Sequence, residues 1–105
     1  MADLQLIYTT WPDSDTAKAC AEKLLGDMLI ACANIFPGGK SVYRWKGVVQ
    51  LDDETVMILK TRPELWDAVS ESLKTLHPYD VPCIIALNPS SASSEFTDWV
   101  ASQTR

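Results

Sequence analysis

Several features that mark common functional classes are missing from this sequence. It has a single histidine, His77, and it contains neither Cys-x-x-Cys nor His-x-x-x-His. A closed structural zinc site within one chain is therefore not expected. No glycine-rich segment leads into a helix, so the usual phosphate-binding loop is missing too. The spacing also shows no pair of nucleophile and base.

Basic residues are few and scattered. There are nine Lys and Arg against 14 Asp and Glu, which gives a formal net charge of -5, and no basic stripe suggests a nucleic-acid partner. No apolar run is long enough to cross a bilayer, and the start, Met-Ala-Asp-Leu, lacks the parts of a secretory signal. Three cysteines without a close pair argue for a reducing compartment. We predict a cytoplasmic protein of one domain, residues 1–105.

The stretch from Cys32 to Lys60 organises the chain. It reads as two strands folded back at Lys46-Gly47, where glycine allows a tight reversal. As one strand, residues 48–60 would span roughly 44 Å, whereas a compact domain of this length has a diameter of about 34 Å. The strand would overhang its domain, and its unpaired backbone groups predict pairing with another copy. An alternative interpretation places a turn at Asp52-Asp53 and makes two short hairpins.

The remaining elements follow from apolar periodicity and from capping residues. We expect strands at 4–10, at 30–45 with a kink at 37–39, at 48–60 and at 81–87, and helices at 14–28, 63–76 and 95–102. Asp13 or Ser14 caps the first helix, Pro63 opens the second, and His77-Pro78 ends it. The apolar stripe of the first helix comprises Ala17, Ala21, Leu24, Leu25 and Met28.

This order, β-α-β-β-α-β with a terminal helix, predicts an α+β fold of the ferredoxin-like type. Two helices then cover one face of a four-stranded antiparallel sheet. The strands do not alternate between apolar and polar residues: Met57 and Leu59 oppose Val56 and Ile58. Both faces look buried, yet the chain has no second layer of helices. An exposed apolar face marks an interface, so strand length and two-sided hydrophobicity both predict an oligomer.

Few side chains are candidates for chemistry. His77 is either a metal ligand or a helix-terminal residue whose ring bonds to a carbonyl or packs against Tyr79. The thiols of Cys32 and Cys83, with imidazole, would suit copper, although buried cysteine often acts as a small hydrophobe. With one histidine per chain, a metal site needs other ligands or other subunits. The acidic run at residues 52–54 is either a site for a hard cation or a solvated strand edge.

Four segments resemble the CutA family of divalent-cation tolerance proteins. They are Leu-Ile-Ala-Cys-Ala-Asn-Ile at 29–35, Ser-Val-Tyr-Arg-Trp-Lys-Gly at 41–47, Met-Ile-Leu-Lys-Thr at 57–61 and His-Pro-Tyr-Asp-Val-Pro at 77–82. The resemblance covers nearly the whole chain and implies a ferredoxin-like subunit in a tight homotrimer, similar in architecture to PII signalling proteins. It also implies a link to tolerance of copper and other divalent metals. No accepted catalytic activity comes with it, so we expect neither an enzyme nor an organic cofactor.

The resemblance also selects candidate site residues. The positions that match the family pattern are Cys32, Asn34, Tyr43, Trp45, Gly47, Lys60, His77, Pro78 and Tyr79. We take His77, Cys32 and Cys83 as candidate metal ligands, and Asn34, Tyr43, Trp45, Lys60, Tyr79 and Asp80 as candidates for a cleft between subunits.

Three departures from the family pattern bear on these candidates. Lys46 and Cys83 stand where the family usually or often has glutamate, which makes the clefts less acidic and adds a thiol. Leu76 stands where some members offer a second histidine to copper.

The sequence therefore predicts a trimeric, non-enzymatic protein that binds copper or another divalent cation near His77 at subunit boundaries. The alternative is a PII-like sensor or adaptor that binds a small anionic ligand in the same clefts, with Lys60 as the counter-charge. A third possibility is an interaction scaffold whose clefts matter little.

Overall fold

The computed structural model describes residues 3–105 and contains one four-stranded antiparallel sheet, against which the helices are placed. Residues 1–2, which belong to the predicted domain and to the start tested for a secretory signal, lie outside the described residues. The elements are β1 (Gln5–Trp11), α1 (Ser14–Gly26), β2 (Cys32–Trp45), β3 (Val48–Thr61), a 3-10 turn η1 (Pro63–Leu65), α2 (Trp66–Leu76), β4 (Ile84–Leu87) and α3 (Ser94–Gln103).

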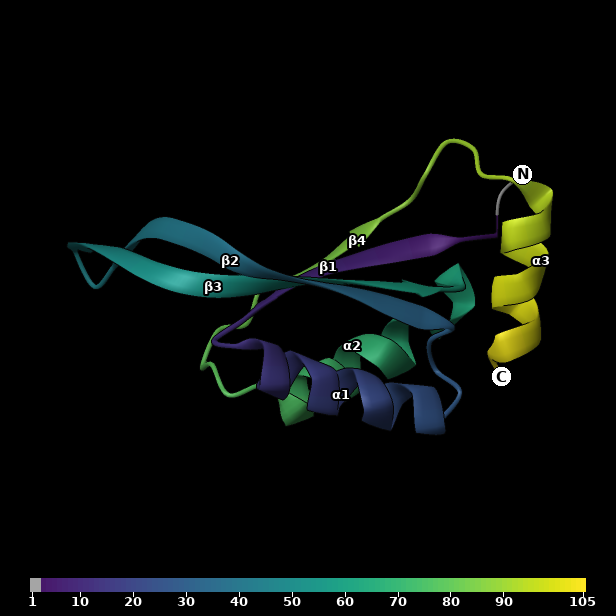
Figure 1. Ribbon diagram of the computed structural model, residues 1–105, viewed down its shortest axis with the longest axis horizontal. Coiled ribbons are helices and arrows are strands. Elements are labelled where there is room, and N and C mark those ends of the chain that lie inside the picture. Colours follow the sequence, from purple (N-terminus) through teal and green to yellow (C-terminus); the bar gives the residue numbers. More distant parts are fainter. Residues whose placement is uncertain (1–2) are drawn as a thin grey trace.

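The strand order is β2-β3-β1-β4, and every neighbouring pair is antiparallel. Helices α1 and α2 lie together under one face of the sheet, and α3 stands across one end of it (Figure 1). The predicted α+β arrangement of four antiparallel strands, with two helices on one face and an extra C-terminal helix, is confirmed.

The core lies between the sheet and the two helices. Alternate residues of β1 are buried, from Gln5 through Ile7 and Thr9 to Trp11, and the helix-facing Met57 and Leu59 of β3 are fully buried. On the opposite face, no helix of the described chain covers the apolar side chains. Phe36, Ile85 and Leu87 keep 51%, 49% and 45% of their surface exposed. The two-sided hydrophobicity of the sequence thus leaves one packed face and one open apolar face.

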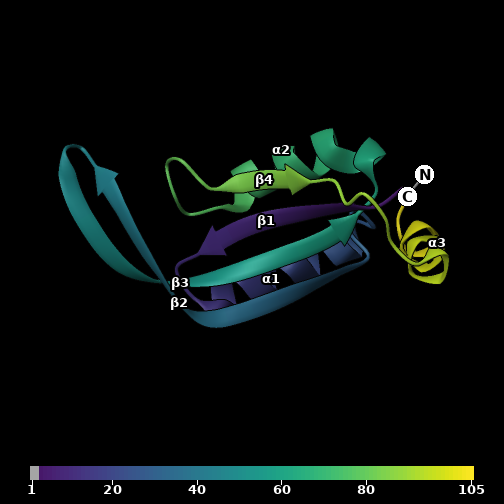
Figure 2. The same ribbon diagram turned by 90° about the horizontal axis from the view of Figure 1, so that it is seen from above.

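Strands β2 and β3, each of 14 residues, form the predicted long hairpin. Its turn is at Lys46-Gly47, where φ is 50° and 81°, and two consecutive positive φ angles are what a type I′ hairpin turn requires. Asp52 and Asp53 lie within the ladder, paired with Ser41 and Lys40, so the alternative turn at these residues is wrong. The hairpin extends well beyond the helices, and the molecule measures 44 Å along its longest axis (Figures 1 and 2).

A bulge interrupts the ladder where a kink was predicted. The pairing shifts register between Phe36 and Gly39, and β2 continues without a break. A Cβ atom on Gly39 would lie 2.8 Å from the backbone oxygen of Glu54, closer than real Cβ contacts occur. Only glycine therefore lets the two strands approach at this point, and the extra residue sets which side chains of β2 face those of β3 beyond it.

Three predicted boundaries need correction. Strand β4 begins at Ile84 instead of Val81, because it follows Pro82, which has no N–H for a ladder. Helix α1 ends at Gly26, and Met28 beyond it has a φ of 58°, which is not helical. The second helix begins as the turn η1, and its α-helical part starts at Trp66. Among residues 3–105, no helix is long and apolar enough to span a membrane.

The apolar stripe of α1 also differs from the prediction. Ala17, Cys20, Ala21 and Leu24 are its buried residues. Leu25 and Met28 are exposed instead. Cys20 thus belongs to the core and acts as a small hydrophobic side chain.

Candidate functional site

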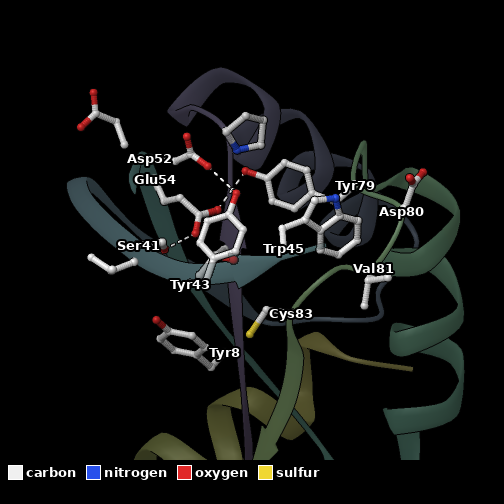
Figure 3. A pocket seen from close by; sticks show the side chains of 14 residues that line it. Tyr8, Ser41, Tyr43, Trp45, Asp52, Glu54, Tyr79, Asp80, Val81 and Cys83 are labelled. Carbon is white, nitrogen blue, oxygen red and sulfur yellow. Dashed lines mark hydrogen bonds between the residues drawn. The ribbon is translucent and has the colours of Figure 1, made fainter. Parts of the chain in front are cut away.

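A pocket of about 780 Å³ lies between the β2–β3 hairpin and the loop that joins α2 to β4 (Figure 3). Its lining combines four aromatic residues (Tyr8, Tyr43, Trp45 and Tyr79) with four acidic residues (Asp52, Asp53, Glu54 and Asp80). Cys83, Ser41 and Thr10 add smaller polar groups, and no lysine, arginine or histidine is part of the lining. The pocket is therefore both acidic and aromatic.

Hydroxyl groups hold two of these carboxylates in place. Glu54 accepts a hydrogen bond from the Tyr79 hydroxyl at 2.8 Å on one oxygen and a hydrogen bond from Ser41 on the other. Tyr43 donates its phenolic hydrogen to Asp52. The strand pairing explains these contacts. Ser41 lies opposite Asp52, and all four side chains lie on the same face. Glu54 is the diagonal neighbour of Ser41, and Tyr43 is the diagonal neighbour of Asp52, so each pair is within reach of a hydrogen bond.

The environment keeps the phenols protonated. Burial raises the pKa of Tyr79, and its hydrogen bond to Glu54 together with the negative charge of Glu54 raises it further. The hydrogen bond to Asp52 raises the pKa of Tyr43. Both phenols therefore act as donors at neutral pH, while the carboxylates they contact remain acceptors with lone pairs to spare.

Cys83 also stays protonated in this pocket. Burial raises the pKa of its thiol, and the nearby charge of Glu54 adds to the effect. A metal ion would therefore have to displace a proton before Cys83 could serve as a thiolate ligand.

One acidic residue of the lining, Asp53, directs its carboxylate to the opposite face of the hairpin from Asp52 and Glu54, where it has a cationic partner. Lys40 of β2 forms an ion pair with Asp53 of β3, and this hydrogen bond lowers the pKa of Asp53. Both side chains are exposed, so the pair contributes little to stability. The other three carboxylates make no ion pair within residues 3–105.

His77 lies outside the pocket lining, and its ring is held by the chain itself. The backbone N–H of Tyr79 donates to Nδ1 at 3.1 Å, so Nε2 carries the hydrogen and donates it to the carbonyl oxygen of Thr10 at 2.7 Å. The ring also stacks on Trp11, with centroids 4.2 Å apart. A metal ion could bind His77 only by displacing one of these hydrogen bonds, so the geometry favours its structural interpretation.

The structure divides the predicted site residues into two groups. Tyr43, Trp45, Tyr79, Asp80 and Cys83 line the pocket. Cys32, Asn34 and Lys60 lie further along the sheet, where Cys32 pairs with Lys60 and Asn34 pairs with Ile58. Within residues 3–105, no three or more His, Cys, Asp or Glu side chains are placed to hold a metal ion.

Several pocket residues were not among the sequence candidates, and two of them, Tyr8 and Ser41, bring polar groups from different strands. Tyr8 comes from β1, and Ser41 of β2 binds Glu54. Strand alternation gave the signal for Ser41, since it shares a face with Tyr43, but the register across the bulge was needed to place it beside Glu54.

Comparison with known proteins decides the family. The family model described as CutA1 divalent ion tolerance protein matches residues 5–103. The chain belongs to this family. The CutA1 fold is also seen in a crystal structure from Ehrlichia chaffeensis, which has 38% sequence identity and a TM-score of 0.95 and covers 100% of this chain and 98% of that one.

Curated CutA relatives are similar in sequence to this protein over most of its chain. The Pyrococcus horikoshii divalent-cation tolerance protein CutA is 39% identical over 95% of this chain and 97% of its own length. The chloroplastic CutA 1 of Oryza sativa is 41% identical over 95% of this chain, which spans only 56% of that relative's length. CutA proteins are divalent-cation tolerance proteins and are not known as enzymes.

The relatives are assigned to different compartments. The rice protein is described as chloroplastic and an Archaeoglobus fulgidus CutA as periplasmic. Membership of the CutA1 family therefore does not fix a compartment for this chain.

Proposed function

We propose that this CutA1 domain, residues 1–105, assembles as a homotrimer and binds a divalent cation, copper foremost, in clefts between its subunits. The observation that carries the proposal is the acidic pocket beside the hairpin, in a chain whose family is described by divalent ion tolerance. Carboxylate oxygens are ligands for hard divalent cations, and the thiol of Cys83 adds a softer donor suited to copper.

The open face of the sheet supports assembly. Phe36, Ile85 and Leu87 are about half exposed there, and the hairpin extends past the end of its own domain. Apolar surface and a projecting strand pair are both stabilised when another copy covers them. A trimer with three equivalent interfaces would cover the open face of each subunit in the same way.

The metal site would be completed by assembly. One chain supplies Asp52, Glu54 and Cys83 to the pocket but does not gather three metal-ligating side chains at one point within residues 3–105. A neighbouring subunit would therefore add the missing donors. Cys32 and His77 remain predicted ligands that this pocket does not include.

The anionic-ligand alternative lacks support at this pocket. Its lining contains no cationic side chain, and Lys60, the predicted counter-charge, pairs with Cys32 and Leu6 at the other end of β3. For location, we propose the cytoplasm, because all three cysteines are free.

Two measurements test the proposal. The mass in solution, from light scattering at micromolar concentration, should be three times that of the 11.7 kDa chain, and a monomer would overturn the assembly. Calorimetric titration with Cu(I), Cu(II) and Zn(II) should show binding that weakens in Glu54→Gln and Cys83→Ser. His77→Ala tests the remaining ligand: unchanged affinity in the folded variant removes His77 from the site.

A further inference from the structure

We propose that residues 93–105, which we call the α3 latch, open as a unit while the rest of the fold stays intact, and that Arg62 is the residue that keeps them closed. The inference does not depend on the metal site or on the pocket beside the hairpin. Three observations carry it: the small apolar contact of α3, the polar contacts at its end and the shortness of the helix.

The apolar contact between α3 and the sheet is small. Of the residues of α3, all of which the structure describes, only Val100 is buried. It packs with Leu4 and Ala31 in a cluster separate from the core between the sheet and the two helices. Phe96 and Trp99 of α3 remain 37% and 43% exposed. Because α3 stands across the end of the sheet with one buried side chain, hydrophobic burial alone holds it weakly (Figure 1).

Polar contacts at the end of the α3 latch supply the rest of the attachment. Arg62, which directly follows β3, donates from Nε to the hydroxyl of Thr104 at 2.9 Å and from Nη2 to the backbone oxygen of Arg105. The backbone N–H of Arg105 donates to the carbonyl oxygen of Met28 at 2.9 Å. In the part of the chain that the structure describes, no other hydrogen bond joins the latch to the rest. One arginine thus makes two of the three bonds that close the latch.

The surroundings of Arg62 strengthen these bonds. Its side chain is 22% exposed, and its third nitrogen, Nη1, donates to Glu64 at 3.0 Å, which orients the guanidinium group. Thr104 is 8% exposed, and its hydroxyl donates its own hydrogen to the carbonyl oxygen of Val100 at 3.0 Å. Hydrogen bonds from a charged donor that is partly shielded from water are stronger than those between neutral groups. Loss of Arg62 would therefore leave a buried oxygen of Thr104 without its donor.

The length of α3 couples its release to its unfolding. α3 has 10 residues, whereas isolated helices shorter than about 12–15 residues are marginal in water. Once its end is released, α3 loses its helical structure together with its contact to Leu4 and Ala31. The core between the sheet and helices α1 and α2 does not include Val100, so it stays folded. Opening of the latch would expose the apolar surface at the starts of β1 and β2.

Hydrogen–deuterium exchange on the whole protein, measured by mass spectrometry, tests the inference. Arg62→Ala should speed up exchange in peptides from α3 by about tenfold, the effect of losing one hydrogen bond from a charged donor. Peptides from α1 and α2 should exchange at the wild-type rate. Arg62→Lys keeps the charge but cannot reach all the acceptors of the guanidinium group, so it should also loosen the latch. Lys18→Ala, on the exposed surface of α1, removes the same charge and should leave α3 unchanged.

Two outcomes would overturn the proposal. Unchanged exchange of α3 in Arg62→Ala would mean that other contacts, such as those with a neighbouring copy, hold the helix. Equal acceleration in all three helices would mean that α3 opens only when the whole fold does.

A second variant covers the case in which Arg62→Ala fails to fold, as judged by circular dichroism. Thr104→Val removes the hydroxyl that Arg62 binds and keeps the shape of the side chain. Faster exchange confined to α3 in this variant would support the latch, and an unchanged α3 would overturn it.

Discussion

At the scale of single residues, the loop after α2 is anchored by a buried aromatic stack. Trp11 is fully buried and donates its indole hydrogen to Thr9 at 2.7 Å, and Thr9 donates in turn to the carbonyl of Met57 at 2.8 Å. His77 stacks on Trp11 and is only 8% exposed. Because His77 also receives the N–H of Tyr79, the stack fixes the direction in which Tyr79 enters the pocket.

Replacing His77 should therefore destabilise the fold. His77→Ala removes the stacking contact and leaves the Thr10 carbonyl without its donor, and together these changes should lower the free energy of unfolding by about 3 kcal/mol. Urea denaturation measures the change. Leu76→Ala, at a neighbouring exposed position, should change stability by less than about 1 kcal/mol. Equal effects of the two substitutions would contradict the structural role of His77.

The pocket thiol gives a prediction on pH. Burial and the charge of Glu54 raise the pKa of Cys83, so less thiolate is present at a given pH than in an exposed cysteine. Glu54→Gln removes the charge and should lower this pKa, which increases the thiolate fraction. Alkylation of Cys83 by iodoacetamide, followed by mass spectrometry from pH 7 to 10, should speed up at a lower pH in the variant. A variant that reacts like the wild type would contradict the influence of Glu54.

The buried thiol of Cys20 gives a second prediction on pH, for the stability of the core. Burial raises the pKa of its thiol to about 11 from 9.0. Its folded-state pKa is higher than its unfolded-state pKa, so the stability contributed by the neutral thiol is present below pH 9.0 and is lost as the pH rises through about 11. Denaturation curves at increasing pH should show this loss, and Cys20→Ala should flatten it.

At the scale of secondary structure, the bulge in β2 sets the register of the outer hairpin. Two residues separate Phe36 from Gly39 on β2, whereas one separates Val56 from Glu54 on β3. Without that extra residue, every side chain of β2 beyond the bulge would move to the other face. Ser41 and Tyr43 would then point away from the carboxylates of β3.

Gly39→Ala tests this dependence. The added Cβ would meet the backbone oxygen of Glu54 at 2.8 Å, so we expect a loss of about 2 kcal/mol in stability and weaker ligand binding in the pocket. Thermal unfolding measures the first effect and calorimetry the second. Gly26→Ala in α1 is the matched control, since a Cβ there has no atom within 4 Å and alanine favours the helix. A control as unstable as Gly39→Ala would remove the contact as the cause.

At the scale of the whole molecule, two surfaces of the single chain lack a covering layer. One is the open apolar face of the sheet, and the other is the projecting hairpin, on which Val42, Val49 and Leu51 are 70%, 61% and 67% exposed. Single exposed apolar residues are ordinary, but a contiguous apolar set on a sheet is typical of an interface. The proposed trimer would cover both surfaces at once.

A charge on the open face should break such an assembly. Ile85→Glu places a carboxylate on β4 where a neighbouring copy would bury it, and the molecular mass from light scattering should fall towards that of the monomer. Leu25→Glu is the control, because Leu25 is 42% exposed but lies on α1, away from this face. If both variants keep the mass of the wild type, the open face is not the interface.

Much of the fold could be predicted because its signals are local. The turn at Lys46-Gly47, the unbroken strand after it and the end of the helix at His77-Pro78 can each be recognised from residues that are neighbours in the sequence. The boundaries that failed depend on competition between neighbouring segments. Val81 reads as strand by itself, yet β4 begins only at Ile84, where pairing with Thr9 becomes possible.

Less of the candidate site than of the fold could be predicted from the sequence. The sequence alone determined that both faces of the sheet would carry apolar side chains, because successive residues of a strand point to opposite faces and this needs no knowledge of the fold. Only the tertiary structure decided that Ser41, Tyr43 and Tyr79 bind Glu54 and Asp52, while Lys60 and Asn34 lie elsewhere. These contacts depend on a one-residue bulge and on a loop anchored by His77, and such long-range geometry leaves no periodic trace in the sequence.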